Sequence, residues 1–189
     1  AGTAGVHELA SGQRVEFGTI TLEDDRPEPR SLSGFGATPA LFAQIATFNS
    51  QEAGTDRIRS VSASGFEIQM QEQKSSNNLR ADETLHWLAI ETGTHGAVDV
   101  TLPGTLSNLG TDAHFDPPAN DLVLIADTQT MNEDDAGALR VAWFTGSPRA
   151  TSAHLYFQED QSEAGEAHAR ERFGVLVMGA GSQPLFAPQ

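Results

Sequence analysis

An internal repeat is the feature that most constrains how this chain can fold. Residues 64–93 hold two runs of alternating apolar residues joined by a polar loop, and residues 150–181 hold a diverged copy of the same unit. Each copy has a Gln-Glu pair after its first run and a glycine, Gly93 or Gly181, after its second. Alternation with a period of two is typical of half-buried β-strands, so each copy predicts a strand pair.

The apolar positions of the two copies correspond one to one. They are Phe66, Ile68 and Met70, then Leu85, Trp87 and Ala89 in the first copy; and Ala153, Leu155 and Phe157, then Phe173, Val175 and Val177 in the second. Because Trp87 is in phase with its apolar neighbours and corresponds to a valine, we expect its ring in the core. The opposite face of the second strands is also apolar, at Leu88, Ile90, Leu176 and Met178. That face must be covered by the opposite layer, by the other repeat or by another subunit.

Further alternating runs extend each copy into a larger unit. They cover 15–22, 41–48 and 57–61 in the first unit and 98–102, 122–128 and 139–145 in the second, with 122–128 matched to 41–47. The run 15–22 changes phase at Gly18, which predicts a β-bulge. Residues 1–12, 23–31, 103–119 and 163–172 are expected to be irregular. The sequence therefore predicts an all-β protein of two tandem antiparallel β-sandwiches, residues 1–96 and 97–189.

The charge of the chain limits its partners. The formal net charge is −15, with 26 acidic and 11 basic residues. Such a surface repels phosphate backbones and anionic lipid, so we expect neither nucleic acid nor an acidic membrane as a partner. It also fits a marine or saline setting. No apolar run reaches the length of a membrane-spanning helix, and the first residue is Ala1, so we expect a processed chain that is secreted or displayed on a cell or virion surface.

Four stretches resemble the H-type lectin domain, especially the tandem versions found in large secreted proteins of marine bacteria. In the first unit they are 42–49, 57–59, 65–72 and 83–93, and looser matches are 122–132, Arg140, 156–159 and 171–181. The resemblance implies a six-stranded sandwich, usually trimeric or hexameric, that binds N-acetylgalactosamine or galactose-like sugars between protomers. In sugar-binding animal members a Trp-His pair follows the strand that begins at Gly-Phe. Here that place holds Gln73 and Lys74, or Asp160 and Gln161, so this specificity does not transfer directly.

Polar residues at the strand ends are the candidates for a carbohydrate site. Sugar hydroxyls need planar hydrogen-bonding groups, and the apolar side of a sugar ring packs on an aromatic ring. The polar candidates are Arg57, Arg59, Gln71, Glu72, Asp82 and Glu83, with Arg140 and Glu159 in the second unit; the aromatic candidates are Trp143 and Tyr156. Alternatively the polar set forms a solvated sheet face with Arg-Glu pairs across strands, Trp143 lies at an inter-domain contact, and Tyr156 is a surface residue without a ligand.

Motifs for metals and catalysis are missing from the sequence. The six histidines lack ligand spacing, and there is no cysteine. The acidic turn 132–137 offers oxygen ligands for calcium but not the order of an EF-hand loop, so a solvated turn is expected. No G-x-S-x-G elbow or phosphate-binding loop occurs, and the repeated acids have no neighbouring His or Tyr to form a relay. We expect no cofactor, no bound metal and no enzymatic activity.

Two functions remain. The first is a non-catalytic carbohydrate-binding module for a galactose-type or algal glycan, in which two sites raise avidity. The second is a structural module of an adhesin, fibre or capsid surface, in which the sandwiches contact each other instead of sugar. Both readings predict a homo-oligomer.

Overall fold

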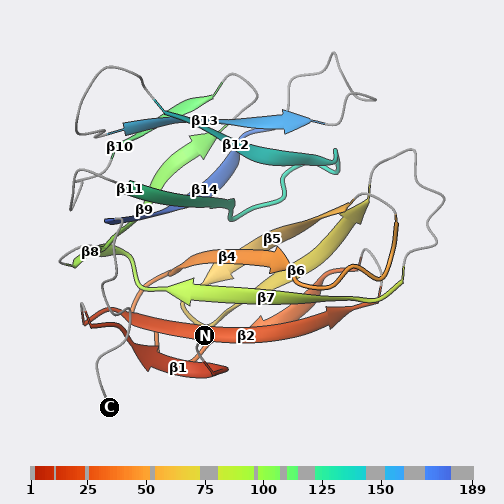
Figure 1. Cartoon of the computed structure of the whole chain (residues 1–189), viewed down its shortest axis with the longest axis horizontal. Helices are drawn as coiled ribbons and strands as arrows, with labels where there is room; N and C mark the ends of the chain where they lie inside the picture. The colour runs from red at the N-terminus through yellow and green to blue at the C-terminus, as the bar shows by residue number, and fades with distance from the viewer. Residues whose placement is uncertain are drawn as a thin grey trace.

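All regular structure in the described part of the chain is β-strand. The computed structural model describes residues 3–10, 12–23, 26–51, 54–72, 81–95, 98–106, 110–114, 122–143, 152–159 and 169–179. Every strand pairing in this part is antiparallel (Figure 1). The all-β antiparallel class predicted from the sequence is confirmed. No helix capable of crossing a membrane is found in the same residues.

The first half of the chain forms two sheets. Its strands are β1 (Gly5–Glu8), β2 (Arg14–Leu22), β3 (Glu28–Ser31), β4 (Ala40–Ile45), β5 (Gly54–Ser62), β6 (Gly65–Glu72) and β7 (Glu83–Ile90). One sheet has the order β1-β2-β7-β4 and the other β3-β6-β5. The two strands predicted at 66–72 and 83–91 are present but lie in different sheets, one on each side of the core, so the predicted pairing between them is wrong.

The second half repeats this strand order. Its strands are β8 (Gly93–His95), β9 (Val98–Leu106), β10 (Thr111–His114), β11 (Leu122–Thr128), β12 (Gly137–Trp143), β13 (Ser152–Glu159) and β14 (Glu171–Gly179). The sheets have the orders β8-β9-β14-β11 and β10-β13-β12. The described part of each half therefore has a four-stranded and a three-stranded sheet, one strand more than the resemblance implies. Since β8 pairs with β9, the second set of sheets begins at Gly93, before the expected boundary at 96.

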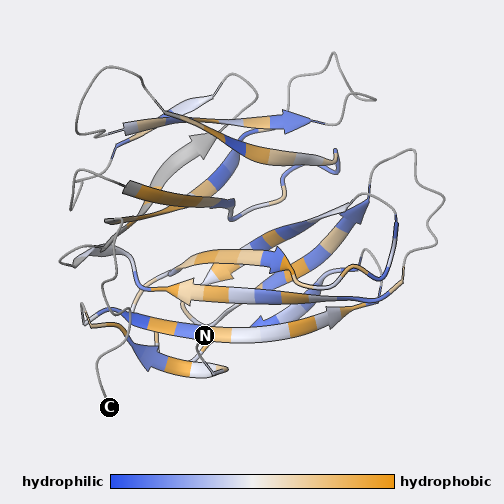
Figure 2. Cartoon of the chain, viewed as in Figure 1, coloured by the Kyte–Doolittle hydropathy of each residue, from blue (hydrophilic) through white to orange (hydrophobic). Residues whose placement is uncertain are grey.

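Each half has its own apolar core between its two sheets. The first core contains Ile58, Ile68, Leu85 and Trp87, and the second contains Leu155, Phe157, Phe173 and Val175. Figure 2 shows the alternation of apolar and polar residues along the strands that builds these cores. Trp87 is buried, with its ring edge-on to Phe66 at 5.2 Å between centroids, as predicted.

A third apolar layer joins the two halves. The outer face of β2, β4 and β7 packs against the outer face of β9 and β14, and the layer contains Val15, Phe42, Leu88, Ile90, Val100, Leu176 and Met178. Of the three covers considered for the second apolar face, the structure shows the other repeat. Figure 1 shows the arrangement, with the strands of the first half below, β9–β14 above, and β8 beside the junction of the two halves.

Three segments expected to be irregular contain strands. They are β1 within 1–12, β3 within 23–31 and β10 within 103–119. These predictions were wrong because all three are four-residue edge strands, whose short patterns show little alternation. Pro29 of β3, which faces Glu67, seemed to exclude a strand, but an edge strand tolerates a residue that cannot donate to the ladder.

The bulge predicted at Gly18 is also wrong, because β2 pairs with β7 in unbroken register. The apparent change of phase arises because Val15 and Phe17 face the other half, whereas Ile20 faces its own core. Gly18 lies opposite Trp87, and a Cβ there would be 2.1 Å from Cζ2 of the indole. The glycine therefore makes room for the tryptophan.

The register of β11 differs from the sequence alignment by two residues. Ile45 of β4 pairs with Leu85, and Thr128 of β11 pairs with Phe173, the residue that corresponds to Leu85. Thr128 thus takes the place of Ile45, not of Thr47 as expected from the sequence. A shift of two preserves the face of every side chain, which is why the alternation alone did not reveal it.

Candidate functional site

Arg57 of β5 is a buried cation that connects the two halves. Its exposed fraction is 1%, and its Nη2 donates to Oε1 of Glu171, which is fully buried at the start of β14, over 3.1 Å. Its Nη1 donates to Oε1 of Gln71 (2.8 Å) and to the carbonyl of Asp135 (3.1 Å). The guanidinium carbon lies 5.1 Å from the ring centroid of Phe157, in cation–π contact. Arg57 therefore has partners in both halves and no free face for a ligand.

Two further carboxyls lie near this cation. Burial raises the pKa of Asp56, and Arg57 opposes the shift. Burial, followed by repulsion from Asp56, raises the pKa of Asp127 well above its ordinary value. Burial also lowers the pKa of Arg57, although the nearby carboxylates, Glu171 first, oppose that change. Three carboxyl groups, those of Asp56, Asp127 and Glu171, thus lie near the one guanidinium of Arg57 in a poorly solvated place.

Side chains of the second half cap the open edge of β4. This strand is last in its sheet, and the backbone N–H of Leu41 donates to Oε1 of Gln129 (2.8 Å), while Nε2 of Gln129 donates to the Leu41 carbonyl (2.7 Å). The N–H of Ala43 donates to Oδ2 of Asp127 (2.9 Å). Edge strands with free backbone groups tend to pair with other chains, and these side chains occupy those groups instead.

A buried glutamate supports one loop in each half. Glu83 accepts hydrogen bonds from the Thr47 hydroxyl (2.5 Å) and from the N–H groups of Asn49 (2.8 Å) and Ser50 (3.0 Å). Glu171 accepts in the same way from the Thr130 hydroxyl and from the N–H of Asn132 (2.7 Å). In the second half this loop contacts the first half, since the side-chain Nε2 of Gln71 donates to the carbonyl of Asp134 (2.5 Å). Glu83 and Glu171 thus position loops, and Gln71 and Glu171 also join the halves.

The other sugar-site candidates of the first half lie elsewhere. Arg59 pairs with Glu67 across β5 and β6, from Nε to Oε2 over 2.8 Å, and both side chains are about one-third exposed. Glu72 is half-buried at the end of β6, and Asp82 is exposed. The buried candidates Arg57, Gln71 and Glu83 therefore do not share a surface with Asp82.

The candidates of the second half lie along β12 and β13. Arg140 is exposed and its Nε donates to Oε1 of Gln158 (2.9 Å), which repeats the Arg57–Gln71 bond on the surface. Tyr156 is half-buried beside His154, with ring centroids 6.5 Å apart, and Glu159 is half-buried at the strand end. Trp143 ends β12, but its side chain lies outside the described residues. Gln73, Lys74, Asp160 and Gln161 lie outside them as well.

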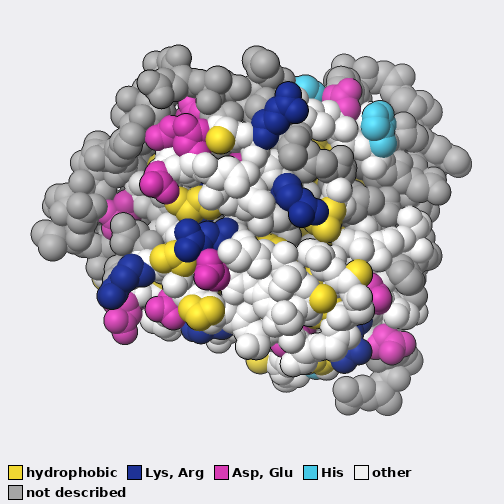
Figure 3. Space-filling model, turned by 180° about the vertical axis from the view of Figure 1, so that it is seen from behind, with side chains coloured by type: hydrophobic (Ala, Val, Ile, Leu, Met, Phe, Trp, Pro, Cys, Tyr) yellow, Lys and Arg dark blue, Asp and Glu magenta, His cyan; other side chains and the backbone are white. Residues whose placement is uncertain are grey.

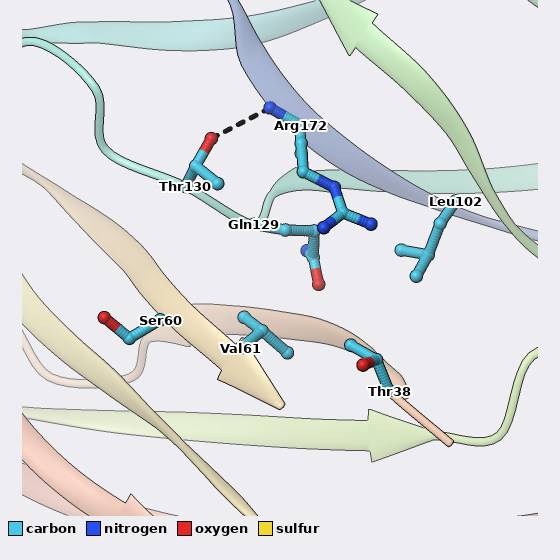
Figure 4. A pocket seen from close by; sticks show the side chains of 7 residues that line it. All are labelled: Thr38, Ser60, Val61, Leu102, Gln129, Thr130 and Arg172. Atoms are coloured by element: carbon cyan, nitrogen blue, oxygen red, sulfur yellow. Dashed lines mark hydrogen bonds between the residues drawn. The ribbon is translucent and has the colours of Figure 1, made fainter. Parts of the chain in front are cut away.

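A pocket of about 220 Å³ lies between the halves. Its lining residues are Thr38, Ser60 and Val61 from the first half and Leu102, Gln129, Thr130 and Arg172 from the second. Figure 4 shows the guanidinium of Arg172 projecting toward the space between Gln129 and Leu102. Within the described part of the chain this guanidinium forms no hydrogen bond or ion pair, because only its backbone N–H is bonded, to the Thr130 hydroxyl (2.8 Å). The pocket therefore offers one cation between apolar walls.

No described residues are arranged for metal binding. The structure brings no group of three or more His, Cys, Asp or Glu side chains together in the described ranges. In the acidic turn 132–137, Glu133 accepts from the N–H of Ala169, and the carbonyls of Asp134 and Asp135 bond the first half. On the face shown in Figure 3 acidic and basic side chains lie interspersed.

The chain is similar to a segment of Halomucin from Haloquadratum walsbyi. The two sequences are 28% identical over 196 aligned positions, which cover 95% of this chain but 2% of Halomucin. That protein is thus about fifty times as long as the matched segment. No protein-family model matches the chain, and no solved structure matches it significantly.

Sequence reasoning missed the residues that line the pocket and cap β4. Gln129 and Asp127 were assigned to a strand and its end without a role, and Arg172 was not considered. The structure, not the sequence, marks Ser60: it follows the Arg-Ile-Arg run, where the β5–β6 register shifts, and it has a positive φ of 56°. A non-glycine residue in that conformation often marks a functional or tightly packed position.

Proposed function

We propose that this protein is a non-catalytic structural module of a longer secreted or surface protein, in which β-sandwiches are joined rigidly to one another. The observation that carries this proposal is the buried contact between Arg57 and Glu171. Removing one partner of such a pair leaves an uncompensated buried charge, so the contact favours one relative placement of the halves.

Two further features support a rigid joint. The apolar layer between the sheets gives the joint a core of its own, and Gln129 and Asp127 occupy the open backbone groups of β4. The similarity to 2% of Halomucin supports the idea that the module is one part of a long chain. The net charge of −15 argues against nucleic acid and acidic membranes as partners.

Calorimetry tests the proposal. We expect the chain to unfold in a single transition, with equal van't Hoff and calorimetric enthalpies, because the halves share buried contacts. Arg57→Ala should separate this transition into two or broaden it. Two independent transitions in the unaltered chain would contradict the proposal, since the halves would then be joined only by the polypeptide.

A second candidate function is binding of an acidic glycan in the pocket. It is favoured by the guanidinium of Arg172, which has no hydrogen-bond or ion-pair partner among the described residues and lies next to Val61 and Leu102. Arginine pairs with carboxylate or sulfate groups, and the apolar walls suit the C–H face of a sugar. At about 220 Å³ the space is below the roughly 300–1,000 Å³ of sites for drug-sized ligands, so it fits one sugar unit of a polymer.

Affinity electrophoresis on neutral and acidic polysaccharides separates the two functions. If the pocket binds an acidic glycan, a uronate or sulfated polymer retards the chain, and Arg172→Ala abolishes the retardation. Arg170→Ala is the matched control, because Arg170 is exposed two residues away and does not line the pocket. Equal migration in every gel would leave the structural function as the sole proposal.

A further inference from the structure

The side chain of Phe48, in the loop after β4, projects from the surface of the first half. It is 82% exposed, the highest value for a large apolar side chain in the described part of the chain. The other large apolar side chains that are exposed in this part belong to β1, β11 and β12. None of them comes from the 46–51 loop or from the strands on either side of it, β4 and β5. Phe48 is therefore a single exposed ring and not part of an apolar patch.

The backbone on both sides of this ring is fixed by hydrogen bonds. Glu83 accepts from the Thr47 hydroxyl (2.5 Å) and from the N–H of Asn49 (2.8 Å). The side-chain Nδ2 of Asn49 also donates to the carbonyl of Asp82 (2.7 Å). Phe48 thus lies between two residues that are both bonded to the start of β7. Because the loop is held without any contact from the ring, a ligand that packs on the ring has little backbone to order.

Two hydrogen-bond acceptors lie beside the ring. Asn49 and Asp82 are exposed, and among the described residues neither the Asn49 amide oxygen nor the Asp82 carboxylate forms a hydrogen bond or an ion pair. An aromatic ring next to planar acceptors suits a sugar, since the ring packs on C–H groups and the acceptors bond hydroxyls. The centre of a protein interface would instead need further apolar side chains around Phe48. The surroundings of the ring therefore favour a sugar over a protein partner.

We infer that Phe48, Asn49 and Asp82 form a binding site for an uncharged sugar unit of a glycan. The phenyl ring packs on the C–H face of the sugar, and the amide and carboxylate oxygens accept hydrogen bonds from its hydroxyls. A uronate or sulfate group would be repelled by the Asp82 carboxylate, so the site differs in its ligand from the pocket beside Arg172. This inference goes beyond the proposed structural function and does not depend on it.

The second half keeps the loop but not the site. Residues 130–132 repeat 47–49, with Nδ2 of Asn132 bonded to the carbonyl of Arg170 (2.6 Å). Met131 takes the place of the phenylalanine and is half-buried, and Arg170 takes the place of the aspartate. The carbonyls that follow in this loop bond the first half. Within the described residues the chain therefore has one such site, and we expect one sugar-binding site per chain.

Affinity electrophoresis in gels that contain a neutral galactan, glucan or mannan tests the site. We expect at least one of these polymers to retard the chain, and Phe48→Ala to abolish the retardation. Phe48→Trp should preserve it, because a larger ring offers the same kind of face. Asp82→Ala should weaken binding at least about fivefold, since a hydrogen bond to a charged group is lost.

Val6→Ala and Arg172→Ala are the controls. Val6 is an exposed apolar side chain on β1, so its loss removes apolar surface elsewhere, and Arg172→Ala removes the cation of the pocket. Both variants should be retarded by the neutral polymer as much as the unaltered chain. The substituted side chains are all exposed, so we expect unchanged melting temperatures, which would show that lost retardation does not come from unfolding.

Several results would overturn the inference. Normal migration in all three neutral gels, or retardation that survives Phe48→Ala, would show that the ring binds none of these sugars. Retardation by an acidic polymer alone would assign glycan binding to the pocket. A dimer that light scattering detects in the unaltered chain but not in Phe48→Ala would assign the ring to a contact between copies. The calorimetric test of the joint is independent of these results, so failure here leaves the structural function standing.

Discussion

Arg57 and Glu171 form an ion pair between two halves of one chain, with 3.1 Å between Nη2 and Oε1 and both side chains out of contact with solvent. The halves are also joined by the apolar layer that contains Phe42 and Leu176. Sequence-distant residues therefore share a single poorly solvated environment. The consequences for stability can be measured.

Loss of Arg57 should be strongly destabilising. In Arg57→Ala, Glu171 keeps its bonds to Thr130 and Asn132 but loses its counter-ion, and Asp56 and Asp127 lose a nearby cation that favours their charged forms. Breaking a buried pair in this way costs about 3–5 kcal/mol. Urea denaturation measures the change, and Arg140→Ala is the control, with an expected loss under about 1 kcal/mol for an exposed side chain. Similar losses in both variants would show that burial of Arg57 has little energetic effect.

The stability of the joint should depend on pH through Asp56 and Asp127. Both have a pKa raised in the folded state, so the folded chain binds more protons than the unfolded chain between the ordinary and the raised pKa. The free energy of unfolding therefore falls as the pH rises through the raised values and is greatest on the acidic side of that window. Asp56→Asn should reduce this slope in denaturation series measured over roughly pH 5 to 8.

The matched control for this pH series is Asp112→Asn. Asp112 lies on the edge strand β10, is exposed and is bonded to His154 of β13. An unchanged slope in Asp56→Asn would assign the pH dependence to the general excess of negative charge instead.

The fold was largely predictable because its strands alternate strictly where a core lies on one side. The predictions for Trp87 and for the apolar faces of Leu88 and Leu176 were confirmed for this reason. The role of Arg57 was not predictable. Arg57 and Arg140 occupy corresponding strand positions, and one is buried while the other is exposed only because the second half covers the first asymmetrically. Local pattern carries no information about which copy is covered.

Capping of the β4 edge should be visible in hydrogen exchange. Gln129→Ala removes the acceptor of the Leu41 N–H and the donor to its carbonyl, so both backbone groups lose their partners. Leaving buried polar groups without partners costs about 1–3 kcal/mol. Exchange of the Leu41 amide should accelerate, whereas Gln158→Ala, which alters only the exposed partner of Arg140, should leave it unchanged. Equal acceleration in both variants would indicate general loosening rather than loss of a cap.

Gly18→Ala tests the close approach of β2 to the indole of Trp87. The added Cβ would lie 2.1 Å from Cζ2 and 2.3 Å from Cε2, so the ring or the strand must move within a filled core. Overpacking of this kind costs about 1–3 kcal/mol. Gly36→Ala is the control, because its Cβ would meet nothing within 4 Å. The double variant with Trp87→Leu should recover part of the loss, since the smaller side chain vacates the space, and that coupling is the signature of a steric conflict. Additive losses in the double variant would instead locate the effect of Gly18→Ala in the backbone of β2.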